Sequence, residues 1–225
     1  MISKLQLQTV VYVAFFVFGA LLLLNGVKLS RSWIGYVSVA AGISAFLATP
    51  FDLWLWRLQI LRGWFVKRPD IKGTWRAAIR SDWEDGTTGH HTPMIEGYVA
   101  IRQTYSLLSI RLMTAESRSE SIGTELIRST DGTFRVLWVY RNDPGFLIRH
   151  RSAIHYGAAI LAISEPRPET LSGHYWTDRH SGGELRLTAR SRALFDDFPA
   201  CQTHFLPAPV AEADAGQSSE RPKPS

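Results

Sequence analysis

VVYVAFFVFGALLLL (residues 10–24) and WIGYVSVAAGISAFLATPFDLWLW (residues 33–56) are two long apolar runs that decide the architecture of the chain. A short polar turn, residues 25–32, separates them. The second run has 24 residues and one acid, Asp52. As a helix it would extend roughly 36 Å, at about 1.5 Å per residue. Since a hydrocarbon core is about 30 Å thick, the two runs predict a pair of helices that cross a membrane.

Two other interpretations of this hairpin are disfavoured by the surrounding sequence. A cleaved signal peptide would have Lys4 as its charged end, but no small-residue cleavage site follows residue 24 and a second, longer apolar run does. A hairpin packed against a soluble core would keep a polar stripe toward water, and neither run has one. We therefore expect both runs to lie in a membrane.

The distribution of Lys and Arg predicts the orientation of the hairpin. Cations gather most densely after the second run, and positive charge marks the cytoplasmic side of a membrane. Two crossings place both termini on one side, so we expect both termini in the cytoplasm and the turn outside. The cations are Lys4 before the first run, Lys28 and Arg31 in the turn, and Arg57, Arg62, Lys67 and Arg68 after the second run.

The net charge of +5 does not indicate a nucleic-acid-binding domain. Residues 1–68 hold seven Lys or Arg and one acid, whereas residues 69–206 hold sixteen of each sign. The excess positive charge therefore flanks the apolar runs, where it orients membrane helices, and the barrel region has no net charge. We expect no DNA or RNA partner. The single Cys201 excludes an intrachain disulfide and fits a reducing compartment.

From residue 73 the apolar period changes to two, which is typical of strands with one buried face. Turn sequences such as STDG (129–132) and NDPG (142–145) separate eight such segments. Eight short antiparallel strands predict a closed barrel or a sandwich. We favour a roughly eight-stranded barrel whose interior can hold a small ligand. The predicted strands are residues 73–83, 94–103, 105–114, 119–128, 133–141, 153–164, 170–178 and 183–190.

The chain is thus predicted to have three parts. Residues 1–68 form the two-helix transmembrane region, residues 69–206 a cytoplasmic ligand-binding barrel, and residues 207–225 a disordered tail of Ala, Pro, Ser and charged residues. We also expect residues 192–198 to form one helical turn that covers a barrel end.

The junction between hairpin and barrel has its own signals. The second helix is expected to continue beyond residue 56 as a basic, aromatic segment at the lipid headgroups, until Pro69 stops it. Gly73 would then permit an unusual backbone turn, and Trp75 would plug the near end of the barrel.

Four motifs together with the apolar hairpin resemble a known family. They are PDIKGTW (69–75), IRQTY (101–105), TAESRSES (114–121) and GHYWTDR (173–179). In their order and spacing they are similar to the two-transmembrane, β-strand-rich effectors of bacterial anti-phage systems (CBASS), which work with a partner nucleotidyltransferase. The resemblance covers nearly the whole chain except the tail. It implies a barrel that binds a cyclic dinucleotide, helices that oligomerise, and an inner membrane that is disrupted in abortive infection.

Candidate ligand contacts lie in or near these motifs, each beside a plainer interpretation. Arg179 could bind a phosphate through two hydrogen bonds, or could form a turn ion pair with Asp178. Ser117, Ser119 and Ser121 share one strand face, which is either a polar interior or a polar outer surface. The aromatic candidates could stack on bases or simply pack in the core. The candidate ligand-binding residues are Gln103, Tyr105, Ser119, Trp138, Tyr140, Tyr175, Thr177 and Arg179.

Other functional classes lack a supporting pattern. The seven His residues are scattered without the spacing of a metal site, and no nucleophile elbow, phosphate-binding loop or paired-carboxylate motif occurs. We therefore expect no metal, no cofactor and no enzymatic activity. The alternative function is a membrane-tethered, lipocalin-like carrier of a lipid or small hydrophobic ligand, suggested by the Gly73-Thr74-Trp75 entry and the strand count.

Overall fold

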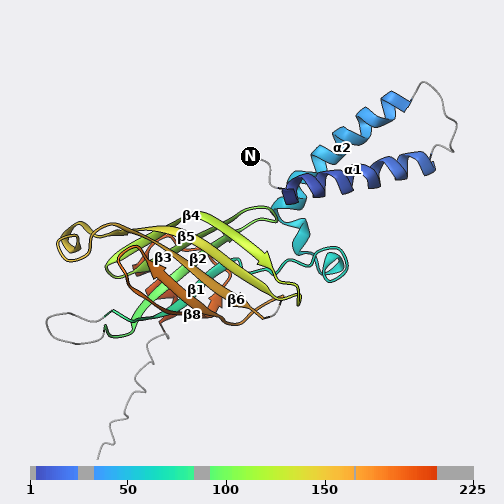
Figure 1. Cartoon of the computed structure of the whole chain (residues 1–225). Coiled ribbons are helices and arrows are strands. Elements are labelled where there is room, and N and C mark those ends of the chain that lie inside the picture. The colour runs from blue at the N-terminus through green and yellow to red at the C-terminus, as the bar shows by residue number, and fades with distance from the viewer. Residues whose placement is uncertain (1–3, 25–32, 84–91, 165, 207–225) are drawn as a thin grey trace, which may run out of the picture.

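An eight-stranded antiparallel barrel forms the body of the molecule (Figure 1). The computed structural model describes residues 4–24, 33–83, 92–164 and 166–206; the predictions for the turn at 25–32 and the tail at 207–225 lie outside these residues. Each strand pairs with its neighbours in sequence, and β1 pairs with β8 to close the barrel. The strands are β1 (Gly73–Ser81), β2 (Ile95–Gln103), β3 (Leu108–Thr114), β4 (Ser117–Arg128), β5 (Phe134–Pro144), β6 (His155–Ile163), β7 (Leu171–Thr177) and β8 (Gly182–Ser191).

Side chains that alternate along each strand fill the barrel interior, as a period of two requires. On β1 the buried residues are Trp75, Ala77 and Ile79, and on β5 they include Val136 and Trp138. The sequence prediction of a roughly eight-stranded antiparallel barrel is therefore confirmed.

Two antiparallel helices, α1 (Lys4–Leu24) and α2 (Trp33–Leu53), project from one end of the barrel (Figure 1). We call this the hairpin end. Among the residues that the structure describes, no helix combines the length and apolar character needed to cross a membrane. The two-helix hairpin is present, and its passage through a membrane stays a prediction.

The expectation that α2 continues toward Pro69 is wrong. The helix stops at Leu53 and is followed by two short 3-10 turns, η1 (Leu55–Arg57) and η2 (Gln59–Leu61). Near the end of α2, a carbonyl oxygen bonds to the barrel instead of to the next turn of helix. The carbonyl oxygen of Asp52 accepts from the amide of Tyr105 at 2.8 Å. The Asp52 carboxylate also accepts from the amide of Ser106 at 2.8 Å, which ties the helix end to the β2–β3 turn.

The Trp75 side chain fills the hairpin end of the barrel, as the sequence predicted. The Trp75 side chain is fully buried, and its indole Nε1 donates to the carbonyl oxygen of Ile71 at 3.0 Å. Gly73 has φ of 141°, and a Cβ there would collide with the backbone carbonyl of Ser191. Only glycine fits this position, where the chain enters the barrel beside the end of β8.

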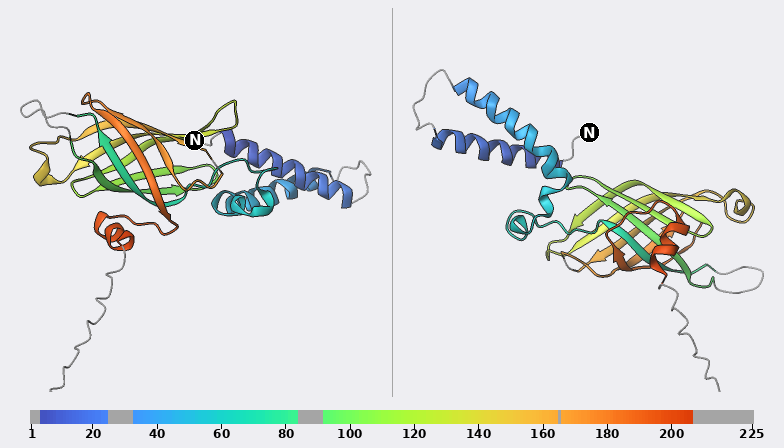
Figure 2. Two further views of the ribbon diagram at one scale, coloured as in Figure 1. Left: turned by 90° about the horizontal axis from the view of Figure 1, so that it is seen from below. Right: turned by 180° about the vertical axis from the view of Figure 1, so that it is seen from behind.

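The third helix, α3 (Phe198–Phe205), corrects the prediction of a helical turn at 192–198. Its N-cap is Asp197, whose side chain accepts from the amide of Ala200 at 2.8 Å. It lies on the outer wall of the barrel, where Phe198 and Phe205 pack against Tyr98 of β2 (Figure 2). The helix therefore covers an apolar outer face and does not cap a barrel end. Cys201, a free thiol, lies on the buried face of this helix.

Candidate functional site

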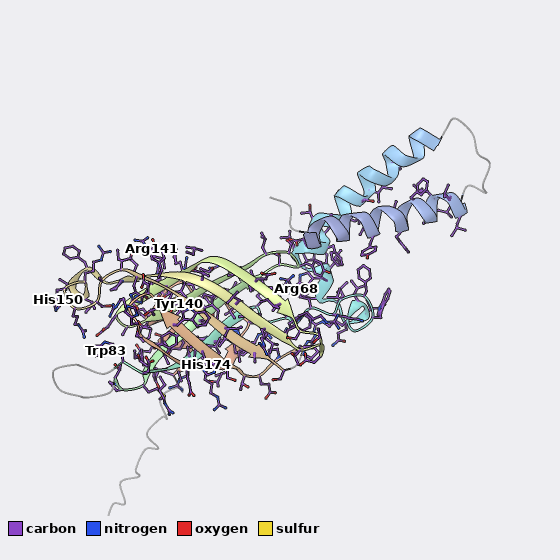
Figure 3. All side chains as sticks on the ribbon, viewed as in Figure 1. Arg68, Trp83, Tyr140, Arg141, His150 and His174 are labelled. Carbon is purple, nitrogen blue, oxygen red and sulfur yellow. The ribbon has the colours of Figure 1, made fainter. Side chains whose placement is uncertain are left out.

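A cavity of about 630 Å³ occupies the end of the barrel opposite the hairpin, which we call the open end. Its lining comes from the inner faces of several strands and from the β3–β4, β5–β6 and β7–β8 connections. Figure 3 labels Tyr140, Arg141, His150 and Trp83 at this end and Arg68 toward the hairpin. The cavity size lies within the range of about 300–1,000 Å³ that small-molecule sites occupy.

Three aromatic residues form the inner part of the cavity: Trp138 and Tyr140 of β5 and Tyr175 of β7. The rings of Trp138 and Tyr140 lie 6.5 Å apart, centroid to centroid, with an interplanar angle of 44°. Burial raises the pKa of both the Tyr140 and the Tyr175 hydroxyl above the ordinary value. Both phenols are therefore neutral near pH 7, and each can donate a hydrogen bond.

A glycine on the neighbouring strand makes room for Tyr140. A Cβ at Gly157 of β6 would lie 2.5 Å from both Cζ and Oη of the Tyr140 side chain. It would also lie 2.7 Å from the carbonyl oxygen of Trp176. Real Cβ atoms do not approach so closely, so the position of the Tyr140 hydroxyl depends on glycine at residue 157.

A buried polar pair lies on the cavity wall above the aromatic residues. The Ser119 hydroxyl donates to Oδ1 of Asn142 at 2.7 Å, and both side chains line the cavity. Asn142 was not among the predicted contacts. The sequence does indicate that Asn142 points inward, because every second residue of β5 does so: Val136, Trp138, Tyr140 and Asn142.

Only part of the predicted Ser face reaches the cavity. Ser117 and Ser119 line it, whereas the Ser121 hydroxyl accepts from the amide of Ile110 at 3.0 Å. The pairing of β4 with β5 shifts register between Ser121 and Gly123. This shift comes after Ser121, which still lies opposite the inward-facing Tyr140, so its hydroxyl is withdrawn from the cavity by its bond to the Ile110 amide and not by a change of face.

Arg179 lies at the cavity mouth, in the β7–β8 turn. Its Nη1 donates to the Ser152 hydroxyl at 3.0 Å and lies 3.4 Å from Nδ1 of His155. Within the described residues no carboxylate lies within ion-pair distance of Arg179, whereas the other mouth guanidinium, that of Arg151, pairs with Glu116. The alternative ion pair with Asp178 is not formed, because that carboxylate accepts from the amide of Tyr156 at 3.1 Å.

Thr177 also lines the cavity, but its hydroxyl is engaged in the turn. It lies 2.8 Å from the Ser181 hydroxyl and 3.2 Å from the Ser181 carbonyl oxygen, and it accepts from the amide of Arg179 at 3.3 Å. The structure thus brings six predicted contacts to one cavity: Ser119, Trp138, Tyr140, Tyr175, Thr177 and Arg179.

Gln103 and Tyr105 are placed at the hairpin end, far from this cavity. The Gln103 side chain accepts from the amide of Ile71 at 2.9 Å and donates to the carbonyl oxygen of Pro69 at 2.8 Å. The Tyr105 ring packs against Phe51 of α2 at a centroid distance of 5.0 Å. Both residues join the hairpin to the barrel, and the structure does not bring them to the ligand cavity.

The cavity combines aromatic and aliphatic walls with hydroxyl and amide groups. Its lining also includes the carboxylates of Glu96 and Glu116, which pair with Arg76 and Arg151, whereas Arg179 has no carboxylate partner among the described residues. Such a set suits a small anionic molecule with flat rings. In the described part of the chain, no group of three or more His, Cys, Asp or Glu side chains is placed to hold a metal ion.

Comparison with known proteins identifies the barrel. The family described as "Cap15, cyclic dinucleotide receptor domain" matches residues 66–189, more than half of the chain. Three relatives bear the name CD-NTase-associated protein 15. The one from Staphylococcus schleiferi is 28% identical over 155 residues, covering 69% of this chain and 79% of the relative.

The other two relatives are similarly distant. The protein from Yersinia aleksiciae is 30% identical over 151 residues, covering 66% of this chain and 68% of the relative. The protein from Escherichia albertii is 23% identical over 151 residues, covering 65% of this chain and 71% of the relative. The family match begins before β1 and ends within β8, and the comparisons agree with the resemblance carried by the sequence motifs. The chain therefore belongs to the Cap15 family of CBASS anti-phage effectors.

Proposed function

We propose that this chain is a CBASS effector whose barrel binds a cyclic dinucleotide made by a partner nucleotidyltransferase. One observation carries the proposal: a cavity of about 630 Å³ combines three aromatic residues with Arg179, a mouth cation without a carboxylate partner in the described chain. A cyclic dinucleotide has two flat bases and two phosphates. The rings of Trp138, Tyr140 and Tyr175 suit the bases, and the Arg179 guanidinium suits a phosphate.

The buried polar pair would add selectivity among bases. The Asn142 side chain keeps its amide nitrogen for a ligand, since the Ser119 hydroxyl bonds to its oxygen. An amide can read the edge of a base through donor and acceptor atoms. We therefore expect Asn142 to contact a base, and we assign the six cavity-lining predicted residues to the same site.

The proposal extends to the hairpin. Ligand binding would drive self-association through α1 and α2, which would disrupt the inner membrane and end the infection by killing the cell. The two-pass topology with cytoplasmic termini is part of this proposal. It is supported by the apolar sequence of both helices and by Gly19 and Gly42, where an added Cβ would meet no atom within 4 Å. Such open small residues leave space for a helix of another copy.

Calorimetric titration of the detergent-solubilised full chain against a panel of cyclic dinucleotides tests the ligand. We expect one or more members to bind with one site per barrel, and a linear dinucleotide of the same bases to bind more weakly. Absence of binding by every member would refute the ligand assignment. Cross-linking in membranes tests assembly separately, because the same species with and without ligand would refute ligand-driven oligomerisation.

The lipid-carrier alternative fits this cavity poorly. Its lining includes Ser117, Ser119, Asn142 and Arg151 as well as Arg179. A carrier of apolar ligands would place hydrocarbon against the Arg151 and Arg179 guanidinium groups at the mouth and remove water from them, which is unfavourable for a charged group. These two cations, beside the aromatic inner part of the cavity, therefore favour the nucleotide.

A further inference from the structure

A tight loop at the hairpin end presents apolar side chains to solvent. We call residues 58–66, which include η2, the η2 loop. Leu58, Ile60, Trp64 and Phe65 are all exposed, with Ile60 at 77% and Trp64 at 71%. Soluble surfaces rarely gather several large apolar groups in so short a segment, and such clusters mark contact sites.

Much of the η2 loop backbone is hydrogen-bonded within the loop. The amides of Leu61 and Arg62 donate to the carbonyl oxygens of Leu58 and Gln59, each at 3.1 Å. The Gly63 amide donates to the carbonyl oxygen of Val66 at 3.1 Å, and the Val66 amide donates to that of Leu61 at 2.8 Å. The indole Nε1 of Trp64 donates to the carbonyl oxygen of Ile60 at 2.6 Å. Internal pairing of backbone groups lowers the cost of bringing a loop to lipid, and much of this loop is paired in that way.

The η2 loop is fixed to the barrel at both ends. Trp56 and Val66 are buried in a cluster with Phe51, against which the Tyr105 ring packs. The guanidinium groups of Arg57 and Arg62 lie 3.7 and 3.6 Å from the Asp70 carboxylate. The loop is therefore held rigidly and presents its exposed side chains in one fixed arrangement.

The charge around the loop fits a lipid surface. Residues 57–68 hold four cations, of which Arg57 and Arg62 face the Asp70 carboxylate while Lys67 is exposed. Aromatic and basic side chains together are enriched where a protein meets the headgroup layer. Figures 1 and 2 show the loop, in cyan, beside the base of α2, at the same barrel end as the hairpin.

We propose that the η2 loop inserts Ile60, Trp64 and their apolar neighbours into the headgroup region of the bilayer, as a contact separate from the hairpin. The proposal rests on the membrane location given under the proposed function. Because the loop is rigidly joined to the barrel, its insertion would fix the barrel at the membrane surface with the cavity mouth turned away from the lipid.

Fluorescence at single cysteines tests this insertion in the full chain. In a Cys201→Ala background, Ile60→Cys, Leu147→Cys and Leu23→Cys variants are each labelled with an environment-sensitive dye. They are then reconstituted with phosphatidylethanolamine–phosphatidylglycerol vesicles that contain a lipid spin-labelled near the headgroup. Leu147 is the matched control, since it is similarly exposed but lies in η3 (Phe146–Ile148), at the open end. Leu23 reports on the hairpin.

We expect a blue shift and quenching at residues 60 and 23 and neither change at residue 147. Quenching at 23 without quenching at 60 would overturn the loop insertion and leave the membrane proposal standing. Quenching at neither position would overturn the membrane proposal and the loop insertion with it. Equal quenching at 60 and 147 would also overturn the proposal, because the contact would then not be specific to the loop.

Discussion

At the hairpin end the barrel interior is filled by Trp75 and Ile71 and held by the Gln103 side chain, whereas at the open end the same strands enclose a cavity of about 630 Å³. Both ends use strands of one pattern, with alternate residues pointing inward. The difference lies in the size and polarity of the inward side chains. Stability and ligand binding are thereby assigned to opposite ends, so substitutions at each end should separate the two properties.

The largest expected effect is on stability, at the filled end. Trp75→Ala would leave a large void around Ile71 and Arg190, and should lower the free energy of unfolding by about 3–5 kcal/mol. Urea unfolding of the full chain in detergent measures this loss. Trp176→Ala, at a half-exposed outer position, is the control and should cost about 1 kcal/mol or less. Equal losses in the two variants would show that the hairpin end is not the stabilising end.

A smaller effect is expected on ligand affinity, at the open end. Arg179→Gln removes a charged hydrogen-bond donor to phosphate, which is typically worth about 1.5–3 kcal/mol. The affinity for a cyclic dinucleotide should therefore fall about 10- to 100-fold, with the free energy of unfolding unchanged. Arg141→Gln is the control, because that side chain is exposed at the same end outside the cavity. A similar loss of affinity in both variants would contradict a specific contact by Arg179.

The smallest effect concerns the buried phenol at the cavity floor. Burial raises the pKa of Tyr140 in the folded state, whereas the unfolded chain ionises near the ordinary value of about 10. This group's contribution to stability is therefore complete below about pH 9 and is lost as the pH rises above 10, by about 1.4 kcal/mol per unit. Urea midpoints measured from pH 8 to 11 should fall less steeply in Tyr140→Phe than in the wild-type chain. Parallel curves would show that the phenol is solvated.

The sequence predicted the strands well because a barrel wall has one apolar face and one polar face. Each predicted strand from residue 73 onward corresponds to an observed strand, and the β5 alternation correctly grouped Trp138 with Tyr140. The same alternation extended by one step predicts Asn142 as an inward group. The apolar pattern alone does not select Asn142, because a polar residue does not continue it.

Two predictions failed for reasons of tertiary structure. Leu58, Leu61 and Trp64 have helical spacing, but Leu61 packs toward the barrel while Leu58 and Trp64 face solvent, so the spacing does not represent one helix face. Gln103 ends the second strand and Tyr105 follows it, and consecutive antiparallel strands end at opposite ends of a barrel. Because β1 begins at the hairpin end, β2 must also finish there, which strand counting alone could have established.

The pairing of β1 with β8 has a consequence for how copies of the chain can meet. Every strand has two hydrogen-bonded neighbours. The β3–β4 seam is the shortest, with residues 111–113 paired to 118–120, and beyond it the Ser121 and Thr124 hydroxyls bond to the β3 backbone. The wall therefore offers little free edge to an incoming strand, which favours assembly through side-chain surfaces or the helices over growth by a shared β-sheet. Such an assembly can form and dissolve while each barrel stays intact.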